Sequence, residues 1–278
     1  MNKHILLIKS PDEKGLVYRI TKTLFAHDLN IISNDEFVEQ ETGTFFMRTA
    51  FEGNTSTDQL LSELQAELSD DAKVRLETPR KKRIVVLGTK EAHCLGDILV
   101  RCQFDEINAE LLGVISNRDR LQGLVEQAGF PFDYISHEDI SREDHEAAII
   151  EKIDAYNPDY IVLAKFMRIL TPEFVSRYPN RIINIHHSFL PAFIGANPYR
   201  QAFERGVKII GATAHFVTND LDEGPIIAQD VLRVGHQLSA SQMAQSGRNV
   251  EKLVLNRALS LVLEDRVFIS GNKTIIFE

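Results

Sequence analysis

The chain has 278 residues, 44% of them hydrophobic, which is enough for two domains with cores of their own. Its 31 basic and 40 acidic side chains give a net charge of −9, which argues against a nucleic-acid-binding protein that relies on a basic surface. Two cysteines argue against a disulfide framework, and no apolar run approaches the roughly 18 residues that a membrane helix needs. The start of the chain does not resemble a secretory signal, so we expect a cytoplasmic protein without nucleic-acid or membrane partners.

Short apolar strands and helical patterns alternate over the first 78 residues. The predicted elements, in chain order, are strand 4–8, helix 16–25, strands 31–38 and 44–51, helix 60–68 and strand 74–76. A Glu-Thr-Gly turn at 41–43 joins the two central strands. This order predicts a ferredoxin-like βαββαβ domain.

Two features of this segment resemble ACT regulatory domains. Asp12-Glu13-Lys14-Gly15-Leu16 follows the first strand, and Asn30 enters the second. ACT domains usually pair and bind a small amino acid. The resemblance therefore implies a regulatory site at Asp12, Gly15 and Asn30, an effector such as glycine or methionine, and a homo-oligomer. Interpreted without the family, Asp12 caps a helix and Gly15 relaxes a turn, with no ligand bound.

A proline and a basic run mark the boundary of this segment. Pro79 breaks the preceding strand, and the positive charges at 80–83 are expected to be solvated. The sequence therefore predicts one domain over residues 1–80 and a second over 81–278.

Apolar strands alternate with helices throughout the second domain. The predicted strands are 84–87, 109–115, 132–134, 160–163, 182–185 and 211–217, and the predicted helices are 95–102, 121–127, 146–155 and 241–264, followed by a hairpin at 270–273. Continuous apolar strands between helices predict an α/β, Rossmann-like domain with a mostly parallel sheet covered on both faces. Ligands bind such sheets beyond the C-terminal ends of the strands, where residues 165–170, Asn184 and His186 are expected.

Residues suited to acyl chemistry gather around two of these strands. Asn184 and His186 are two positions apart on one strand and therefore point to the same face. Asp222 lies in the loop after strand 211–217. An amide and an imidazole can stabilise a developing oxyanion, and a carboxylate can orient water or accept its proton. The set suits attack on an acyl carbon without a covalent enzyme intermediate.

Each residue of the set also has a structural interpretation, as a turn-forming amide, a core histidine or a turn aspartate. A zinc site made by His186, His187, His215 and Asp222 is a further alternative, but the sequence lacks standard ligand spacing. Ser188 is a poor nucleophile because no G-x-S-x-G elbow surrounds it. We therefore predict neither a metal nor another cofactor.

Taken together, the motifs resemble those of the folate-dependent formyltransferases. The matching segments are Asn184-Ile185-His186, Gly211-x-Thr213-x-His215 and Leu221-Asp222-x-Gly224-Pro225. The resemblance implies that Asn184, His186 and Asp222 are catalytic, with Ser188 and His215 supporting them. It also implies a folate loop, in which the backbone of Met167, Arg168, Ile169 and Leu170 holds the pterin ring. Without the family, this loop is an apolar segment of the kind more often found in a core.

Departures from the glycinamide ribonucleotide transformylases favour hydrolysis over transfer. Those enzymes cradle a substrate phosphate in a glycine- and serine-rich loop. Here the corresponding segment, 88–96, carries Glu91 and lacks clustered glycines, and segment 193–199 differs too.

The ACT-like segment and the form of the motif at 184–196 resemble the formyltetrahydrofolate deformylase family over essentially the whole chain. This implies hydrolysis of 10-formyltetrahydrofolate, the folate substrate, to formate and tetrahydrofolate, which supply one-carbon and purine metabolism. A formyltransferase acting on an amine and a catalytically silent folate or amino-acid sensor are the alternatives.

Overall fold

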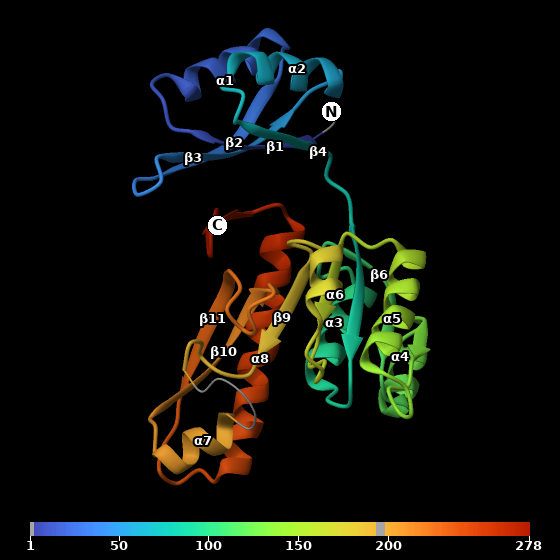
Figure 1. The fold of residues 1–278 in the computed structure, drawn as a ribbon. Coiled ribbons are helices and arrows are strands. Elements are labelled where there is room, and N and C mark those ends of the chain that lie inside the picture. The colour runs from blue at the N-terminus through green and yellow to red at the C-terminus, as the bar shows by residue number, and fades with distance from the viewer. Residues whose placement is uncertain (1–2, 193–197) are drawn as a thin grey trace. The chain divides into compact units, whose positions relative to one another are not determined.

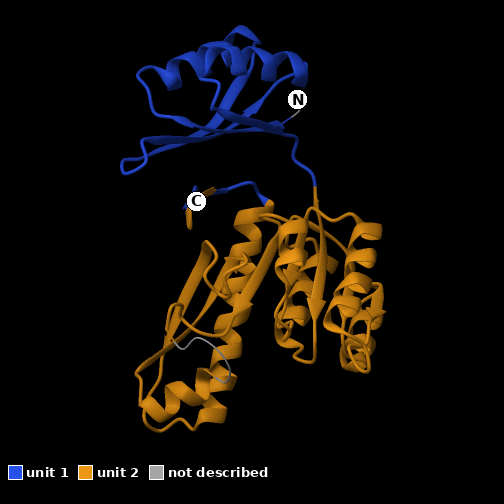
Figure 2. Ribbon diagram, in the orientation of Figure 1, with its two compact units in different colours: residues 1–80, 264–268, 275–278 blue, residues 81–263, 269–274 orange. Residues whose placement is uncertain are grey.

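The computed structural model describes residues 3–192 and 198–278. The chain forms two compact units, drawn in blue and orange in Figure 2. The first comprises residues 1–80, 264–268 and 275–278, and the second comprises residues 81–263 and 269–274. The sequence pattern assigned the whole end of the chain to the second domain, whereas part of it belongs to the first unit.

The first unit is an antiparallel sheet with both of its helices on one face (Figure 1). Its elements are β1 (Lys3–Pro11), α1 (Leu16–Ala26), β2 (Asn30–Glu39), β3 (Thr44–Glu52), α2 (Thr57–Glu67) and β4 (Lys73–Glu77). The strands lie in the order β2-β3-β1-β4. The predicted ferredoxin-like fold is confirmed.

Side chains from alternate positions of β1 build two cores on opposite faces of this sheet. Leu6 and Ile8 pack under the helices, against residues such as Ile20 and Leu60. Leu7 points the other way and packs with three phenylalanines, Phe46, Phe268 and Phe277. Two of the three come from the end of the chain, which explains why this end belongs to the first unit.

The second unit contains the remaining elements. The strands are β5 (Lys82–Gly88), β6 (Ala109–Ser116), β7 (Phe132–Tyr134), β8 (Tyr160–Leu163), β9 (Ile182–His186), β10 (Ile209–Phe216) and β11 (Ile226–Arg233). The helices are α3 (His93–Gln103), α4 (Gln122–Gln127), α5 (Arg142–Tyr156), α6 (Pro172–Arg177), α7 (Pro198–Arg205) and α8 (Ala240–Leu263), with a 3₁₀ turn at Asp119–Leu121. A hairpin of β12 (Val267–Ser270) and β13 (Lys273–Ile276) ends the chain, and its residues are divided between the two units.

The seven strands form one sheet in the order β11-β10-β9-β8-β5-β6-β7. Strands β5 to β9 pair in parallel, as predicted. Val85 and Leu87 pack in a core with α5 and α6, so Ile84 and Val86, which are also fully buried, point to the opposite face. The mostly parallel sheet, with strands buried on both faces, is confirmed.

Strand β10 departs from the parallel pattern. It runs antiparallel to β9, with Thr213 opposite His186 and His215 opposite Asn184. Strand β11, which the sequence pattern did not predict, pairs with it in the same sense. The loop between β10 and β11 therefore begins beside the start of β9, where Val217 N donates to Ile182 O over 2.9 Å.

The basic run at the start of the second unit is not fully solvated, contrary to expectation. Lys82 is buried, and β5 already begins there. Arg83 donates to the carbonyl oxygens of Tyr156 and Asn157 at the end of α5. These carbonyls end a helix and need donors, which the arginine supplies.

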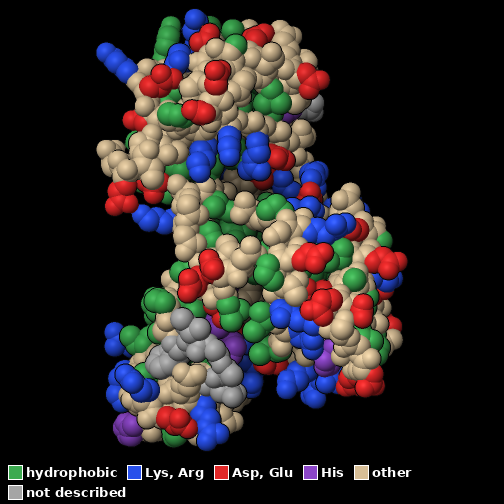
Figure 3. All heavy atoms as spheres, in the orientation of Figure 1, with side chains coloured by type: hydrophobic (Ala, Val, Ile, Leu, Met, Phe, Trp, Pro, Cys, Tyr) green, Lys and Arg blue, Asp and Glu red, His purple; other side chains and the backbone are tan. Residues whose placement is uncertain are grey.

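No helix in the described residues is long and apolar enough to cross a membrane. On the face drawn in Figure 3, basic and acidic side chains are interspersed.

Candidate active site

Residues predicted for folate binding and for catalysis line one cavity of about 290 Å³ in the second unit. Its wall includes the whole folate loop, Met167, Arg168, Ile169 and Leu170, together with Asn184, His186, His215 and Asp222. Lys165 and Phe166, which belong to the segment 165–170 expected at the strand ends, also line it. The further lining residues are Leu163, Val175, Ile185, His187, Val217, Thr218, Asn219 and Leu221. The structure thus brings together residues that lie up to 59 positions apart in the sequence, from Leu163 to Asp222.

Asn184 and His186 reach the cavity from the end of β9. Asn184 Nδ2 lies 3.2 Å from Nε2 of His215, its neighbour across the strand pair. His215 Nδ1 lies 2.9 Å from Phe216 O, an acceptor, so Nδ1 carries the proton and neutral Nε2 accepts from the amide. His215 therefore supports Asn184 by fixing the orientation of its amide.

Asp222 faces His186 from the loop between β10 and β11. Its Oδ1 lies 3.3 Å from His186 Nδ1 and 3.8 Å from His215 Nε2. Because the loop begins at the far end of β10, it must fold back over the sheet to reach His186. Asp222 adopts the left-handed backbone conformation, with φ at 58°, which aspartate tolerates better than most residues other than glycine.

Gly224 allows this return of the loop. A Cβ added to it would lie 1.8 Å from the carbonyl oxygen of Phe216, so no larger residue fits without moving the backbone. Phe216 N also donates to Pro225 O over 2.9 Å. The Asp-x-Gly-Pro motif is therefore a packing motif as well as a chemical one, a role that the sequence alone did not reveal.

The charges around Asp222 keep it ionised. Burial on its own would raise the pKa of this carboxyl group. The hydrogen bond to His186 and the positive charge that His186 can carry outweigh burial, so the net effect is a pKa below the ordinary value. Burial also lowers the pKa of His215, in keeping with its neutral role.

His186 has one ring nitrogen free for a ligand. Nδ1 faces Asp222, while Nε2 is buried and has no hydrogen-bond partner among the described residues. A buried nitrogen without a partner is costly unless a substrate supplies one. The neighbouring His187 differs, because burial and the charge of Lys165 lower its pKa to about 4. Of the adjacent pair, His187 is thus the imidazole held neutral.

Ser188 does not line the cavity of about 290 Å³. It lies beside a separate, mainly apolar cavity of about 370 Å³, and its buried Oγ has no partner among the described residues. Its backbone carbonyl accepts from Thr213 Oγ1 over 2.9 Å, and Thr213 Oγ1 accepts from Leu190 N over 3.1 Å. Thr213, rather than the Ser188 hydroxyl, therefore fixes the chain that leaves His186.

The folate loop is open toward the cavity and tethered from behind. Met167 and Ile169 are 52% and 59% exposed, unlike core residues. Met167 N donates to Thr89 Oγ1 over 3.1 Å, Ile169 O accepts from Arg142, and Thr171 N donates to the Glu146 carboxylate over 3.0 Å. The apolar side chains are thus presented to a ligand on a fixed backbone.

A buried charge cluster beside the loop was not predicted from the sequence. Glu251, on α8, lies 3.2 Å from Lys165 Nζ, accepts from Tyr199 over 2.6 Å and lies 2.8 Å from His93 Nε2. The hydrogen bond to His93 and the charge of Lys165 outweigh burial, which would raise the Glu251 pKa, and bring it to about 2. A sequence signal existed, because Glu251 falls on the apolar face defined by Gly247, Val250 and Val254.

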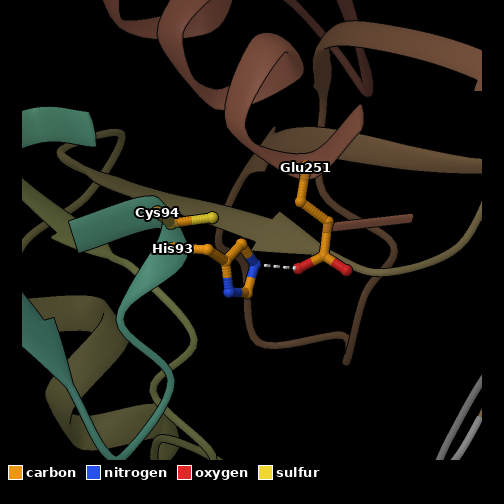
Figure 4. A group of neighbouring side chains, drawn as sticks. All are labelled: His93, Cys94 and Glu251. Atoms are coloured by element: carbon orange, nitrogen blue, oxygen red, sulfur yellow. Dashed lines mark hydrogen bonds and ion pairs between the residues drawn. The ribbon is translucent and has the colours of Figure 1, made fainter. Parts of the chain in front are cut away.

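Part of this cluster has the donor types of a metal site. Donor atoms of His93, Cys94 and Glu251 lie within 4.8 Å of one another, and Figure 4 shows His93 and Glu251 joined by a hydrogen bond with Cys94 beside them. The zinc set weighed from sequence, His186, His187, His215 and Asp222, does not form such a group in the described part of the chain. However, Glu251 is already paired with Lys165, and burial raises the pKa of the Cys94 thiol, which disfavours the thiolate that a metal binds. These residues therefore fit an ion-pair cluster better than a metal centre.

A larger cavity of about 990 Å³ adjoins the first and shares Lys165, Met167, Arg168 and His187 with it. Its other basic lining residues are Lys90, Arg118, Arg120, Arg200 and Arg248. The segment after β5 contributes Thr89, Lys90 and Glu91. Positive charge is therefore present even though the glycine-rich phosphate loop is absent. Of the differing segment 193–199, residues 193–197 lie outside the described residues.

The residues predicted for amino-acid binding do not all meet within one copy of the chain. Asp12 and Gly15 line a cavity of about 480 Å³ in the first unit, together with Glu36 and Phe37 of β2. Gly15 precedes α1 with φ at +89°, a conformation that suits glycine. Asn30 opens β2, opposite Glu52, at the other end of that strand.

Each of the two parts of the chain matches a known protein family. Residues 82–259 match the formyl transferase family model, and residues 4–69 match that of the ACT domain. The formyltetrahydrofolate deformylase of Haemophilus influenzae is 55% identical, with 99% of each chain covered. That of Bacillus subtilis is 45% identical over 99% of this chain and 94% of its own.

Solved structures show the same relationship. A formyltetrahydrofolate deformylase from Pseudomonas syringae superposes with a TM-score of 0.96 at 38% identity, covering 100% of this chain and 95% of its own. A glycinamide ribonucleotide transformylase from Symbiobacterium toebii reaches a TM-score of 0.69 at 33% identity, covering 74% of this chain and 98% of its own. The chain therefore belongs to the formyltetrahydrofolate deformylase family, in which an ACT domain precedes a formyl transferase domain.

Proposed function

We propose that the chain hydrolyses 10-formyltetrahydrofolate to formate and tetrahydrofolate, and that Asn184, His186 and Asp222 carry the reaction. The observation behind this proposal is the single cavity that unites these three residues with the Met167–Leu170 loop. The loop would hold the pterin ring through its backbone and place the formyl group at the end of β9. Full-length similarity to deformylases supports hydrolysis as the reaction.

In the proposed mechanism, water attacks the formyl carbon and negative charge develops on the formyl oxygen. His186 Nε2, which lacks a partner among the described residues, and the amide of Asn184 donate to that oxygen. When the bond from the formyl carbon to N10 breaks, formate leaves and N10 takes a proton. Each group thus acts on charge that appears only during the reaction.

The role of Asp222 follows from its ionisation. A carboxylate with a lowered pKa is a weak base toward water in the free enzyme. It is well suited to hold a positive imidazolium at His186, only 3.3 Å away. We therefore favour Asp222 as the partner of His186 that also orients the water. Asp222 receives a proton from the water only as the intermediate forms, and it passes this proton to N10 as N10 departs.

A single assay tests the proposal. Purified protein is incubated with 10-formyltetrahydrofolate without an amine acceptor or added metal, and formate and tetrahydrofolate are quantified. We expect stoichiometric release of both. No turnover under these conditions would reject hydrolysis.

The basic cavity next to the site gives a specific reason to include an amine acceptor in a second arm. It could hold an anionic group of an acceptor such as a ribonucleotide amine. Labelled formyl found on an added amine would indicate a transferase. We expect the label in formate alone, whether or not the amine is present.

The ACT domain suggests control by an effector, and we further propose that this effector is a small amino acid, with glycine and methionine as opposing candidates. The cavity at Asp12 and Gly15 offers a place for it. Asn30 could take part only from a second copy in a homo-oligomer, because it lies at the far end of β2. Activity measured with each amino acid tests this, and no response to either would leave the domain a role in assembly. A cytoplasmic location stays a prediction.

A further inference from the structure

Lys165 has an unusual backbone conformation at the entrance of the folate loop. Its φ is 62°, in the left-handed region, where the Cβ of any residue other than glycine crowds the backbone. It lies just after β8 and precedes Phe166 and Met167. A residue in this conformation persists only when its surroundings over-determine it, so the contacts of Lys165 must hold it in place.

The side chain of Lys165 is held by Glu251. The two side chains are 3% and 1% exposed, and Nζ lies 3.2 Å from a carboxylate oxygen. Either charge alone would be very unfavourable at this depth, so each depends on the other. The Tyr199 hydroxyl and His93 complete the hydrogen bonding of the carboxylate, which fixes its orientation. Figure 4 shows the approach of His93 to this carboxylate.

This pair joins two parts of the second unit that are distant in sequence. Glu251 sits on the long helix α8, and Lys165 begins the loop that presents Met167 and Ile169 to the cavity. Further along, Thr89 and Glu146 tether the same loop at Met167 and Thr171. The pair with Glu251 differs from these tethers because it is an ion pair with a side chain of the loop itself, and it acts at the residue with the left-handed backbone.

We propose that Glu251 is a positioning residue for the deformylase reaction, holding Lys165 and thereby the folate loop in the conformation that binds the pterin ring. This inference rests on the proposed function, because it takes the Met167–Leu170 loop as the folate site. Glu251 does not touch the substrate in this scheme. Its loss weakens substrate binding more than it slows chemistry.

Substitution of both partners tests the proposal. Glu251→Gln keeps the shape and the bond to Tyr199 but leaves the Lys165 ammonium buried without a carboxylate. We expect KM for 10-formyltetrahydrofolate to rise on the order of tenfold, while kcat changes by less than about threefold. In the double variant Lys165→Gly/Glu251→Gln, Glu251 has no partner left through which to act, so KM should be no higher than in Glu251→Gln alone.

The controls separate positioning from folding. Lys252→Gln changes a charge on the same helix outside the cluster and should leave KM unchanged. Thermal unfolding of each variant shows whether it remains folded at the assay temperature. An unchanged KM in Glu251→Gln, a loss confined to kcat, or a double variant whose KM exceeds that of the single one would overturn the proposal.

Failure of the positioning role can be told apart from failure of the proposed function and from metal binding. If the wild-type protein released no formate, the proposed function would fail, whereas a normal wild type with an unaffected Glu251→Gln variant would reject only the positioning role. Zinc bound one to one in the purified protein, together with loss of activity on chelation, would indicate that Glu251 is a metal ligand. That result would also reject the positioning role. We expect neither bound zinc nor an effect of chelator.

Discussion

Asp222 combines a left-handed backbone, a partly buried carboxylate and a contact with His186. Replacing it by asparagine keeps the size of the side chain but removes the negative charge that stabilises the imidazolium. We expect Asp222→Asn to lower kcat by roughly 10³-fold, as for loss of a general acid–base group, with little change in folate binding. Steady-state kinetics and binding of a folate analogue check both parts.

Asp220→Asn is the matched control, because Asp220 is exposed in the same loop. It should retain full turnover. Turnover of Asp222→Asn near the wild-type rate would show that the assignment is wrong.

His187 makes stability depend on pH. Its pKa is lowered to about 4, mainly by burial, against about 6.5 in an unfolded chain. Between these values the unfolded state binds the proton more readily. The free energy of unfolding is therefore unaffected by this group above pH 6.5, falls as the pH drops toward 4, and is then constant. The loss is at most about 3 kcal/mol and is smaller if solvent screens the partly exposed ring.

Chemical denaturation of the wild type and of His187→Asn from pH 7.5 to 4 measures this effect. The variant should lose less stability over that range, since it lacks the titrating group. Parallel curves for the two proteins would contradict a His187 that is held neutral in the folded protein.

At the scale of residues, the sequence predicted those that stand in local motifs. Asn184, His186, Asp222 and the folate loop meet in one cavity, as the chemistry and the family resemblance implied. Their roles in catalysis are still proposals. Glu251 was missed because its partner, Lys165, lies 86 positions away, and no local pattern connects a helix with a distant loop.

At the scale of elements, the direction of the strands was the main feature that could not be predicted from the sequence. An apolar run such as β10 has the same pattern whether it pairs in parallel or antiparallel, and only its partners decide. Strand β11 escaped prediction because most of its second half is exposed at the sheet edge. The consequence for function is large, because the antiparallel β10 sends the Asp222 loop back over β9.

Gly224 provides a test of that loop. In Gly224→Ala, the new Cβ would meet the Phe216 carbonyl oxygen at 1.8 Å, so the backbone two residues from Asp222 must shift. A displacement of about 1 Å in a catalytic group can cost on the order of 10²-fold in rate, and we expect kcat to fall by about that factor. Kinetics and the thermal midpoint would be measured together.

Gly235→Ala is the matched substitution for this test. A Cβ at Gly235 meets nothing within 4 Å, so activity and stability should be unchanged. Wild-type kinetics in Gly224→Ala would mean that the loop can relax without moving Asp222.

At the scale of the whole molecule, both folds could be predicted from the sequence, but the division of the chain between the units could not. The end of the chain looks from its pattern like a simple extension of the second domain. Its phenylalanines instead pack on the sheet of the first unit, and Arg48 donates to the carbonyl oxygens of Glu264 and Asp265 just after α8. A periodic apolar pattern indicates which face of an element is buried, but it does not indicate which other element packs against that face.

Phe46 offers a test of this connection. It is fully buried against Phe268, with ring centroids 5.5 Å apart, whereas Phe25 on α1 is 82% exposed. Phe46→Ala should cost about 3–5 kcal/mol of stability, and Phe25→Ala, as the control, should cost less than about 1 kcal/mol. Because Phe46 holds the end of the chain, Phe46→Ala should also speed hydrogen exchange at residues 267–276, more than 200 positions away in the sequence. Unchanged exchange there, despite lower stability, would show that the chain end does not depend on this face of the sheet.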